Sequence, residues 1–346
     1  MDNLKLFTAV AAFSSTLFFG CKEEIDSPPS SPINPNSTEV EPSTCVDPPI
    51  RLFLLDQYKS WGKEATFTAV DTKLIMDQLA LGHAVFYETS ATNQFFGFKG
   101  EYSNLVNKEF TSLKRFWDIK SDNIDMVAAH GSMLQDRNKV FKTYKAYGLN
   151  DRQANDKADS VATFLKTYPQ YLNGDHSAFT YNQYATPDSI YPEAGRVTRK
   201  IIIGDGILQG YAALGYGDIA AQAILAHEFG HQIQLSLGIL KNGMIPTPKT
   251  ARRVELMADA YAAYYLSHAR GAALQRQSMQ QVLEVFFNVG DCRFAAPSHH
   301  GTPTQNKAAA EWGYKLANDA HKQGHILPSR EFARLFDAAL QNILRN

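Results

Sequence analysis

The stretch Ala226-His227-Glu228-Phe229-Gly230-His231-Gln232 lies inside a longer run of helix-forming sequence, residues 218–237. Asp218 is placed to cap the start of this helix, and Gly238 is placed to end it. Apolar residues recur near helical spacing on the faces that the histidines leave free: Ile224, Leu225, Ile233 and Leu235. The sequence therefore predicts one long helix that carries both histidines.

The spacing of the two histidines predicts a metal site. His227 and His231 are four residues apart, so on an α-helix their side chains lie only ~40° apart around the axis. Two imidazoles placed in this way can direct one nitrogen each to a shared ion. Glu228 is rotated by ~100° from His227, so its carboxylate can reach a bound water without becoming a ligand. The alternative is a helix whose two histidines are only hydrogen-bonded or exposed, but the apolar helical context favours the metal site.

A second helix is predicted after the Gly- and Pro-containing connection at residues 241–249. It carries Glu255 and Asp259 one turn apart, among small or apolar neighbours, where two carboxylates are costly unless they are paired or bound to metal. Glu255 is therefore predicted as the third metal ligand, and Asp259 as the acceptor of an imidazole N–H that fixes a ligating histidine. An ordinary amphipathic helix is the alternative. If Glu255 is not the ligand, His299 or His300 is next in line.

These residues resemble the Glu-zincin pattern. More narrowly, residues 227–231 with Glu255-Leu256-Met257-Ala258-Asp259 are similar to bacterial neutral zinc metallopeptidases, which carry His-Glu-x-Gly-His and a later Glu-Leu-x-Ala-Asp. The likeness continues at Val289-Gly290-Asp291 and at His300-Gly301-Thr302-Pro303-Thr304-Gln305. It covers roughly residues 199–315. Cys292 stands where the family tends to have a second Asp, and the chain before residue 199 holds no motif of the family.

The resemblance implies a zinc-dependent metallopeptidase, with one Zn2+ per chain on the two histidines and Glu255, and with a peptide or protein as substrate. Glu228 would act as general base on a zinc-activated water. His300 is the first candidate for a donor to the oxyanion, and Tyr261 is the second. A non-catalytic surface binding lipoprotein that retains a structural zinc site is the alternative, and a hydrolase of small molecules is a third possibility. The intact Glu228 argues against the binding protein, because holding zinc does not require a carboxylate there.

The expected fold is α+β and mostly helical, a zincin-like metallopeptidase domain with a small sheet and an active-site helix. Arg199-Lys200-Ile201-Ile202-Ile203-Gly204 predicts a strand, because β-branched residues end at Gly-Asp-Gly. An extended substrate could pair with residues 201–203, as it does with the edge strand that precedes the active-site helix in zincins. Residues 50–198 are expected to form a mainly helical N-terminal part of the catalytic unit, and residues 199–346 the zinc-binding part. Further helices are predicted at residues 72–81, 102–116, 151–167, 272–287, 305–323 and 330–344.

The N-terminal sequence predicts export and lipid attachment. Lys5 is followed by an apolar run at residues 6–19, too short for a permanent span, and then by Gly20-Cys21, which resembles a bacterial lipobox. Residues 1–20 are thus expected to be a lipoprotein signal peptide, and Cys21 the lipidated residue. Lys22-Glu23-Glu24 resembles a signal for transport to the cell surface. A plain secretory signal with an incidental cysteine is the alternative.

Residues 21–49 are rich in Pro and Ser and poor in apolar side chains, which predicts a disordered tether between a lipid anchor and the folded part. The expected location is an outer membrane, facing the periplasm or the cell surface. Cys45 and Cys292 remain after lipidation, in an oxidising compartment, so they could form a disulfide. The net charge of −1 and the lack of a basic stripe argue against a nucleic-acid partner.

Overall fold

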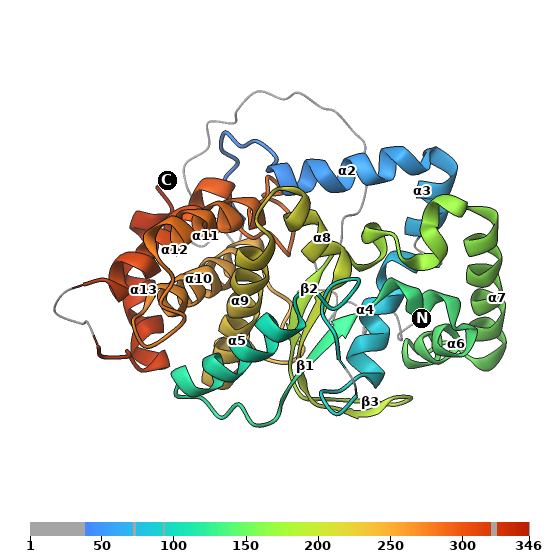
Figure 1. The fold of residues 1–346 in the computed structure, drawn as a ribbon, viewed down its shortest axis with the longest axis horizontal. Helices are drawn as coiled ribbons and strands as arrows, with labels where there is room; N and C mark the ends of the chain where they lie inside the picture. Colours follow the sequence, from blue (N-terminus) through green and yellow to red (C-terminus); the bar gives the residue numbers. More distant parts are fainter. Residues whose placement is uncertain (1–38, 72–73, 93, 320–323, 346) are drawn as a thin grey trace.

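The computed structural model describes residues 39–345, except residues 72–73, 93 and 320–323. The predicted signal peptide, the lipidation site Cys21 and most of the predicted tether therefore lie outside the described residues. The described chain is mostly helical with a small mixed sheet, as the sequence predicts (Figure 1). None of its helices is both long enough and apolar enough to cross a membrane.

The main sheet has three strands in the order β1-β5-β2. β1 (Ile124–Ala129) runs parallel to β5 (Arg199–Gly204), and β2 (Gln183–Thr186) runs antiparallel to it. The strand predicted at residues 199–204 is confirmed as β5, and it is buried on both faces, which explains its unbroken run of isoleucines. β5 is the central strand, however. The expectation that a substrate pairs with residues 201–203 is wrong, because both edges of that strand are already occupied.

The two outer edges of this sheet differ. The outer edge of β1 is covered by the chain before α5, since Ser90 Oγ accepts from the Met126 amide at 2.8 Å and Gln94 Oε1 accepts from the Ala128 amide at 2.7 Å. β1 itself lies in a part of the chain that the sequence predicts as mainly helical, and the sequence analysis does not identify this strand. A separate hairpin is formed by β3 (Ser189–Tyr191) and β4 (Gly195–Val197).

The helix that carries the histidine motif is α9 (Gly217–Leu237), and it packs beside α10 (Pro248–Ser267). A Cβ atom built on Gly230 of α9 would lie 3.0 Å from Cα and 3.2 Å from Cβ of Ala258 in α10, so glycine at this position permits the close approach of the two helices. The surrounding helices share one hydrophobic core with them (Figure 1): α5 (Ser103–Phe116), α8 (Asp205–Ala213), α11 (Arg276–Val289), α12 (Pro303–Ala317) and α13 (Ser329–Ile343).

A second cluster of helices lies on the other side of the sheet from α9 and α10 (Figure 1). Its members are α2 (Pro49–Trp61), α3 (Lys63–Val70), α4 (Met76–Tyr87), α6 (Arg137–Ala146) and α7 (Asp151–Thr167), with the short 3-10 helices η1 (Gly131–Gln135), η2 (Pro169–Gly174) and η3 (Ser177–Thr180). Trp61 packs on Tyr58, Tyr171 and Phe179 in its core. α2 reaches back from this cluster toward α11, so the two clusters are joined by helix contacts as well as by the sheet.

Most predicted helices are confirmed with shifted ends. α7 matches its predicted bounds, and α9 ends at Gly238 in the left-handed conformation as expected. Asp218, by contrast, does not cap α9, because Tyr216 is the N-cap residue and no side chain bonds to the first amides. Asp218 instead lies in the first turn, where a negative charge still complements the helix N-terminus. α12 begins at Pro303, two residues earlier than predicted, after a capping box between Thr302 and Gln305.

Cys45 and Cys292 are joined by a disulfide in the structure, with their Cα atoms 5.6 Å apart. The bond connects the chain just before α2 to the loop that follows α11, across 247 residues of sequence. Asn288 at the end of α11 reinforces this connection, because its side-chain oxygen accepts from the Ile50 amide at 2.9 Å. The N-terminal end of α2 is thereby held against the loop at residues 290–301.

Candidate metal centre

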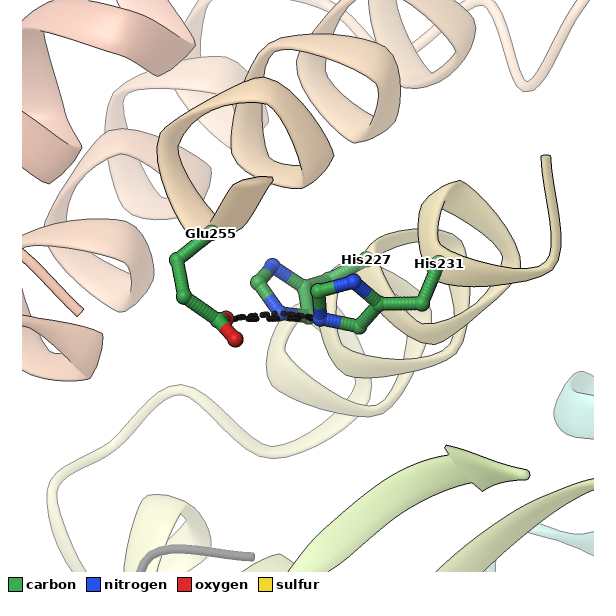
Figure 2. Close-up of side chains that lie close together, drawn as sticks. All are labelled: His227, His231 and Glu255. Atoms are coloured by element: carbon green, nitrogen blue, oxygen red, sulfur yellow. Dashed lines mark hydrogen bonds and ion pairs between the residues drawn. The ribbon is translucent and has the colours of Figure 1, made fainter. Parts of the chain in front are cut away.

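α9 places the two imidazoles of the predicted motif side by side. The Nε2 atoms of His227 and His231 lie 3.1 Å apart, and both side chains are buried (Figure 2). Their positions one helical turn apart on α9 produce this convergence, as the spacing predicts. The sequence prediction that these two residues share one point in space is confirmed.

α10 brings Glu255 to the same point (Figure 2). Its Oε2 atom lies 3.2 Å from His227 Nε2 and 3.3 Å from His231 Nε2, and it makes no hydrogen bond in the described structure. Ligand atoms about 2.0–2.1 Å from a tetrahedral zinc ion lie about 3.3–3.4 Å from one another. The three observed separations of 3.1 to 3.3 Å match the edges of such a tetrahedron. This cluster of His227, His231 and Glu255 could therefore hold a metal ion.

Both imidazoles are fixed from behind by side-chain acceptors. His227 Nδ1 lies 2.7 Å from Asp259 Oδ1, and His231 Nδ1 lies 2.9 Å from Gln234 Oε1. The Gln234 amide in turn donates to the Val254 carbonyl of α10 at 2.6 Å. Each acceptor can take a hydrogen bond from an Nδ1–H group, which orients the ring so that its Nε2 atom points toward the cluster. Asp259 was predicted in this role, whereas Gln234 was missed, although its position three residues after His231 is a usable signal.

Glu228 is buried beside the cluster and lines the same cleft. Its Oε2 atom is buried and has no hydrogen-bond partner among the described residues. Burial raises the pKa of Glu228, and the neighbouring imidazoles of His231 and His227 oppose part of that rise. A buried carboxylate with one oxygen unengaged and a raised pKa is suited to accept a proton from a reactant in the cleft.

The electrostatics of the cluster follow from three buried carboxyl groups and three imidazoles. Burial alone would raise the pKa of Glu255, but the charges of His231 and His300 hold it well below its usual range. Burial raises the pKa of Asp259 to about 6, against the opposing effect of its bond with His227. Glu255 is thus the group most strongly held as an anion, which is the state that a metal ligand requires.

His300 also reaches the cluster, from the loop that precedes α12. Its Nε2 atom lies 3.7 Å from Glu255 Oε2, while its Nδ1 atom lies 3.2 Å from Asp291 Oδ2, which also accepts from the His300 amide at 3.0 Å. His299 contacts the other oxygen of Asp291, with its Nδ1 atom 2.7 Å from Oδ1. Burial would raise the pKa of Asp291, but its bonds with His299 and His300 hold it well below the usual value.

Two alternatives from the sequence are not brought to the cluster. Tyr261 is fully buried, and its hydroxyl donates to the Ser329 carbonyl at 2.6 Å, so the expectation of Tyr261 as a second oxyanion donor is wrong. His299 is paired with Asp291 and is not among the three residues that could share a metal. In the sequence, Asp291 stands out only as part of the Val289-Gly290-Asp291 motif. Its contact with both histidines gives it a role that sequence spacing did not reveal.

The cleft beside the cluster has a volume of about 30 Å3, with room for roughly two waters at ~10–15 Å3 each. One wall is the edge strand β2, which contributes Gln183, Tyr184 and Ala185. The Asn182 carbonyl accepts a hydrogen bond from the Gly204 amide at the end of β5. In an antiparallel pair, the backbone N–H and C=O groups of every second residue point to the partner strand. The backbone groups of Gln183 and Ala185 therefore point away from β5. The sequence predicts only loop or short strands for residues 174–191, so it does not locate β2 within them, because four residues bounded by Pro187 give a weak signal.

Comparisons of this chain with protein-family models, with curated proteins and with solved structures find no match.

Proposed function

We propose that this chain is a zinc-dependent metallopeptidase of the Glu-zincin type, built on a zincin-like domain. The observation that carries the proposal is the convergence of His227 Nε2, His231 Nε2 and Glu255 Oε2 within 3.1 to 3.3 Å of one another. In the described part of the chain, no other group of His, Cys, Asp or Glu brings three possible ligand atoms so close together. Two imidazoles and one carboxylate are a donor set that suits zinc.

The arrangement favours a catalytic site over a structural one. Structural zinc sites are closed by four protein ligands, whereas catalytic sites keep a position open for a reactant. Here three protein ligands converge, and the remaining side opens to the cleft lined by Glu228. A binding protein with a structural zinc site, the alternative from the sequence, would need neither the cleft nor the unengaged Glu228 oxygen.

A bound zinc ion would supply a Lewis acid for the scissile carbonyl and would lower the pKa of a coordinated water toward neutrality. Glu228 would take the proton of the attacking water and pass it to the leaving amine. Asp259 and Gln234 would hold the two imidazoles in the orientation that keeps Nε2 available. His300, held by Asp291, would donate from Nε2 to the oxygen that gains negative charge.

The substrate is proposed to be an extended peptide that adds to the edge of β2. The backbone groups of Gln183 and Ala185 face away from β5, and both residues line the cleft of the metal cluster. Main-chain pairing of this kind gives affinity without requiring a particular side chain. Such a peptide would bring its carbonyl groups past Glu228 and His300, which line the same cleft.

The proposed location is outside the cytoplasm, on a lipid anchor at Cys21. The disulfide between Cys45 and Cys292 supports an oxidising compartment, because such bonds persist mainly in secreted and periplasmic proteins.

Removal of the metal is expected to abolish peptide cleavage. A soluble form that lacks the first 21 residues keeps Cys45 and hence the disulfide, and it should cleave casein or a peptide library. Treatment with 1,10-phenanthroline should stop cleavage, and added Zn2+ should restore it, because the attacking water is activated by the ion. Metal content and cleavage rate would be measured on the same sample. Cleavage that persists after the protein has lost its metal would contradict the proposal.

Replacement of His300 by Ala is expected to lower kcat and kcat/KM together by roughly 100-fold, the scale for one oxyanion donor, with KM nearly unchanged. Metal content should stay the same, because His300 is not one of the three clustered ligands. The matched control is His325→Ala, which removes an exposed histidine that does not line the cleft. Steady-state kinetics at the wild-type level in His300→Ala would remove His300 from the mechanism.

A further inference from the structure

A second cavity adjoins the metal cleft. Its volume is about 100 Å3, compared with about 30 Å3 for the cleft. Gln183 and His300 line both spaces, so they form the boundary between them. A peptide that is paired with β2 and has its scissile carbonyl at the cluster would therefore place a neighbouring residue at the mouth of this cavity. The space is sufficient for the side chain of one amino acid.

The lining of this cavity is mainly apolar, and its charged residues include two arginines. Ile50 and Leu54 of α2 and Ile207 of α8 line it, and so do Arg51 and Arg293. Both arginine side chains are about three-quarters buried, with exposed fractions of 26% and 25%. A guanidinium at the end of an apolar pocket is suited to bind a carboxylate, because its planar array of N–H donors matches the two oxygens.

Each of the two arginines has one aspartate within ion-pair distance. Asp47 pairs with Arg51 at 3.0 Å, but Asp47 is partly exposed and does not line the cavity, and exposed ion pairs contribute little. Asp291 does line it and lies 3.7 Å from Arg293. Its two oxygens already accept from His299 Nδ1, His300 Nδ1 and the amides of Arg293 and His300. The negative charge of Asp291 is therefore directed mainly at the histidines.

Gln183 supplies an independent indication of a peptide ligand. Its Oε1 atom is buried and makes no hydrogen bond in the described structure, although buried amide oxygens are nearly always paired. Gln183 stands between the two spaces, where a peptide N–H would pass. A bound peptide would provide the donor that this oxygen lacks.

We propose that this cavity is a specificity subsite for a substrate carboxylate, in which Arg51 is the main determinant and Arg293 assists. The inference rests on the proposed peptidase function and defines its substrates as peptides with a carboxylate next to the scissile bond. That carboxylate has two possible sources, an acidic side chain within the chain or the carboxyl terminus of the peptide. Both present the same group to the same guanidinium.

The test uses octapeptides that are neutral except for one Glu, moved along the sequence, with acetylated and amidated ends. A matched set has Gln in place of Glu, and a third set is neutral but has a free carboxyl terminus. The wild-type chain should cleave the best Glu peptide, or the free-terminus peptide, with a kcat/KM at least about tenfold above its neutral partner, the scale of a hydrogen bond between charged groups. Faster cleavage of the Glu peptide would identify an acidic side chain as the source of the carboxylate. Faster cleavage of the peptide with the free carboxyl terminus would identify the terminus.

Arg51→Gln should reduce this preference to nearly one while leaving metal content and cleavage of the neutral peptides unchanged. Arg51→Lys keeps the positive charge but loses the planar guanidinium with its paired N–H donors, so it should retain part of the preference for carboxylate peptides. The control is Arg334→Gln, on an exposed arginine of α13. Thermal unfolding of each variant would show whether it is folded. If Arg51→Gln does not fold, the test rests on Arg51→Lys and Arg293→Gln. Each of these variants should weaken the preference for carboxylate peptides over neutral ones.

Binding to the Glu228→Gln protein separates this inference from the proposed function. Calorimetry with the same peptides needs no turnover, so it tests the cavity even if the wild-type chain cleaves nothing. Tighter binding of the carboxylate peptides, lost in a Glu228→Gln/Arg51→Gln double variant, would support the subsite. Equal affinity for the charged and neutral peptides, or a preference that survives the replacement of both arginines, would overturn it.

Discussion

Replacement of Glu228 by Gln is expected to lower kcat for peptide cleavage by roughly 100- to 10,000-fold, the range for loss of a positioned general base. The amide has nearly the same shape as the carboxylate but cannot accept the proton of the attacking water. The metal content should not change, because Glu228 is not part of the cluster formed by His227, His231 and Glu255. Single-turnover kinetics and metal analysis of the same preparation would check both parts.

Glu284→Gln is the matched control for this variant. Glu284 lies on α11, pairs with Lys307 at the surface and does not line the cleft. Its replacement should leave both kinetics and metal content at the wild-type level. A Glu228→Gln protein that is as active as the wild type would show that the proton goes elsewhere, and the catalytic proposal would then lose its base.

Replacement of Glu255 by Ala is expected to remove nearly all of the bound metal, and with it the activity. Glu255 supplies the only oxygen ligand in the predicted set, and its Oε2 atom completes the triangle with the two Nε2 atoms. Asp259→Ala should have a smaller effect, about 10- to 100-fold in metal affinity, because Asp259 acts only through His227. Competition with a fluorescent chelator would rank wild type, Asp259→Ala and Glu255→Ala in that order.

The comparison between these two variants tests the assignment of the third ligand. Both residues lie on α10, one turn apart, and both are buried, so a general effect of losing a buried carboxylate would appear in each. A Glu255→Ala protein that keeps full metal occupancy would mean that the third ligand lies elsewhere. His300 would then be the first candidate, because its Nε2 atom lies 3.7 Å from the Oε2 atom of Glu255.

The local part of the candidate site could be predicted from the sequence. The angle between His227 and His231 is fixed by helix geometry, and the pair Glu255 and Asp259 follows the same rule on the next helix. The meeting of the two helices is a tertiary property. It depends on Gly230 facing Ala258, which neither motif specifies by itself.

The parts that could not be predicted are assembled from distant segments. β1 and β2 are short, and they exist as strands because each pairs with β5, far away in the chain. The dependence on distant partners also explains why the substrate was wrongly expected to pair with residues 201–203 of β5. An apolar run identifies a buried strand, but whether that strand is central or at an edge depends on partners that its own sequence does not describe. The second cavity likewise combines α2, α8 and the loop after α11.

The disulfide between Cys45 and Cys292 encloses nearly all of the described residues up to the end of α11, including β1, β2, β5 and the helices α9 and α10. A single cut of the backbone anywhere between these cysteines would leave both pieces in one covalent molecule. On a gel without reducing agent, the nicked chain would still migrate as one species. Each piece would also remain beside the other, so the helices that carry the histidines and Glu255 would not separate by diffusion after such a cut.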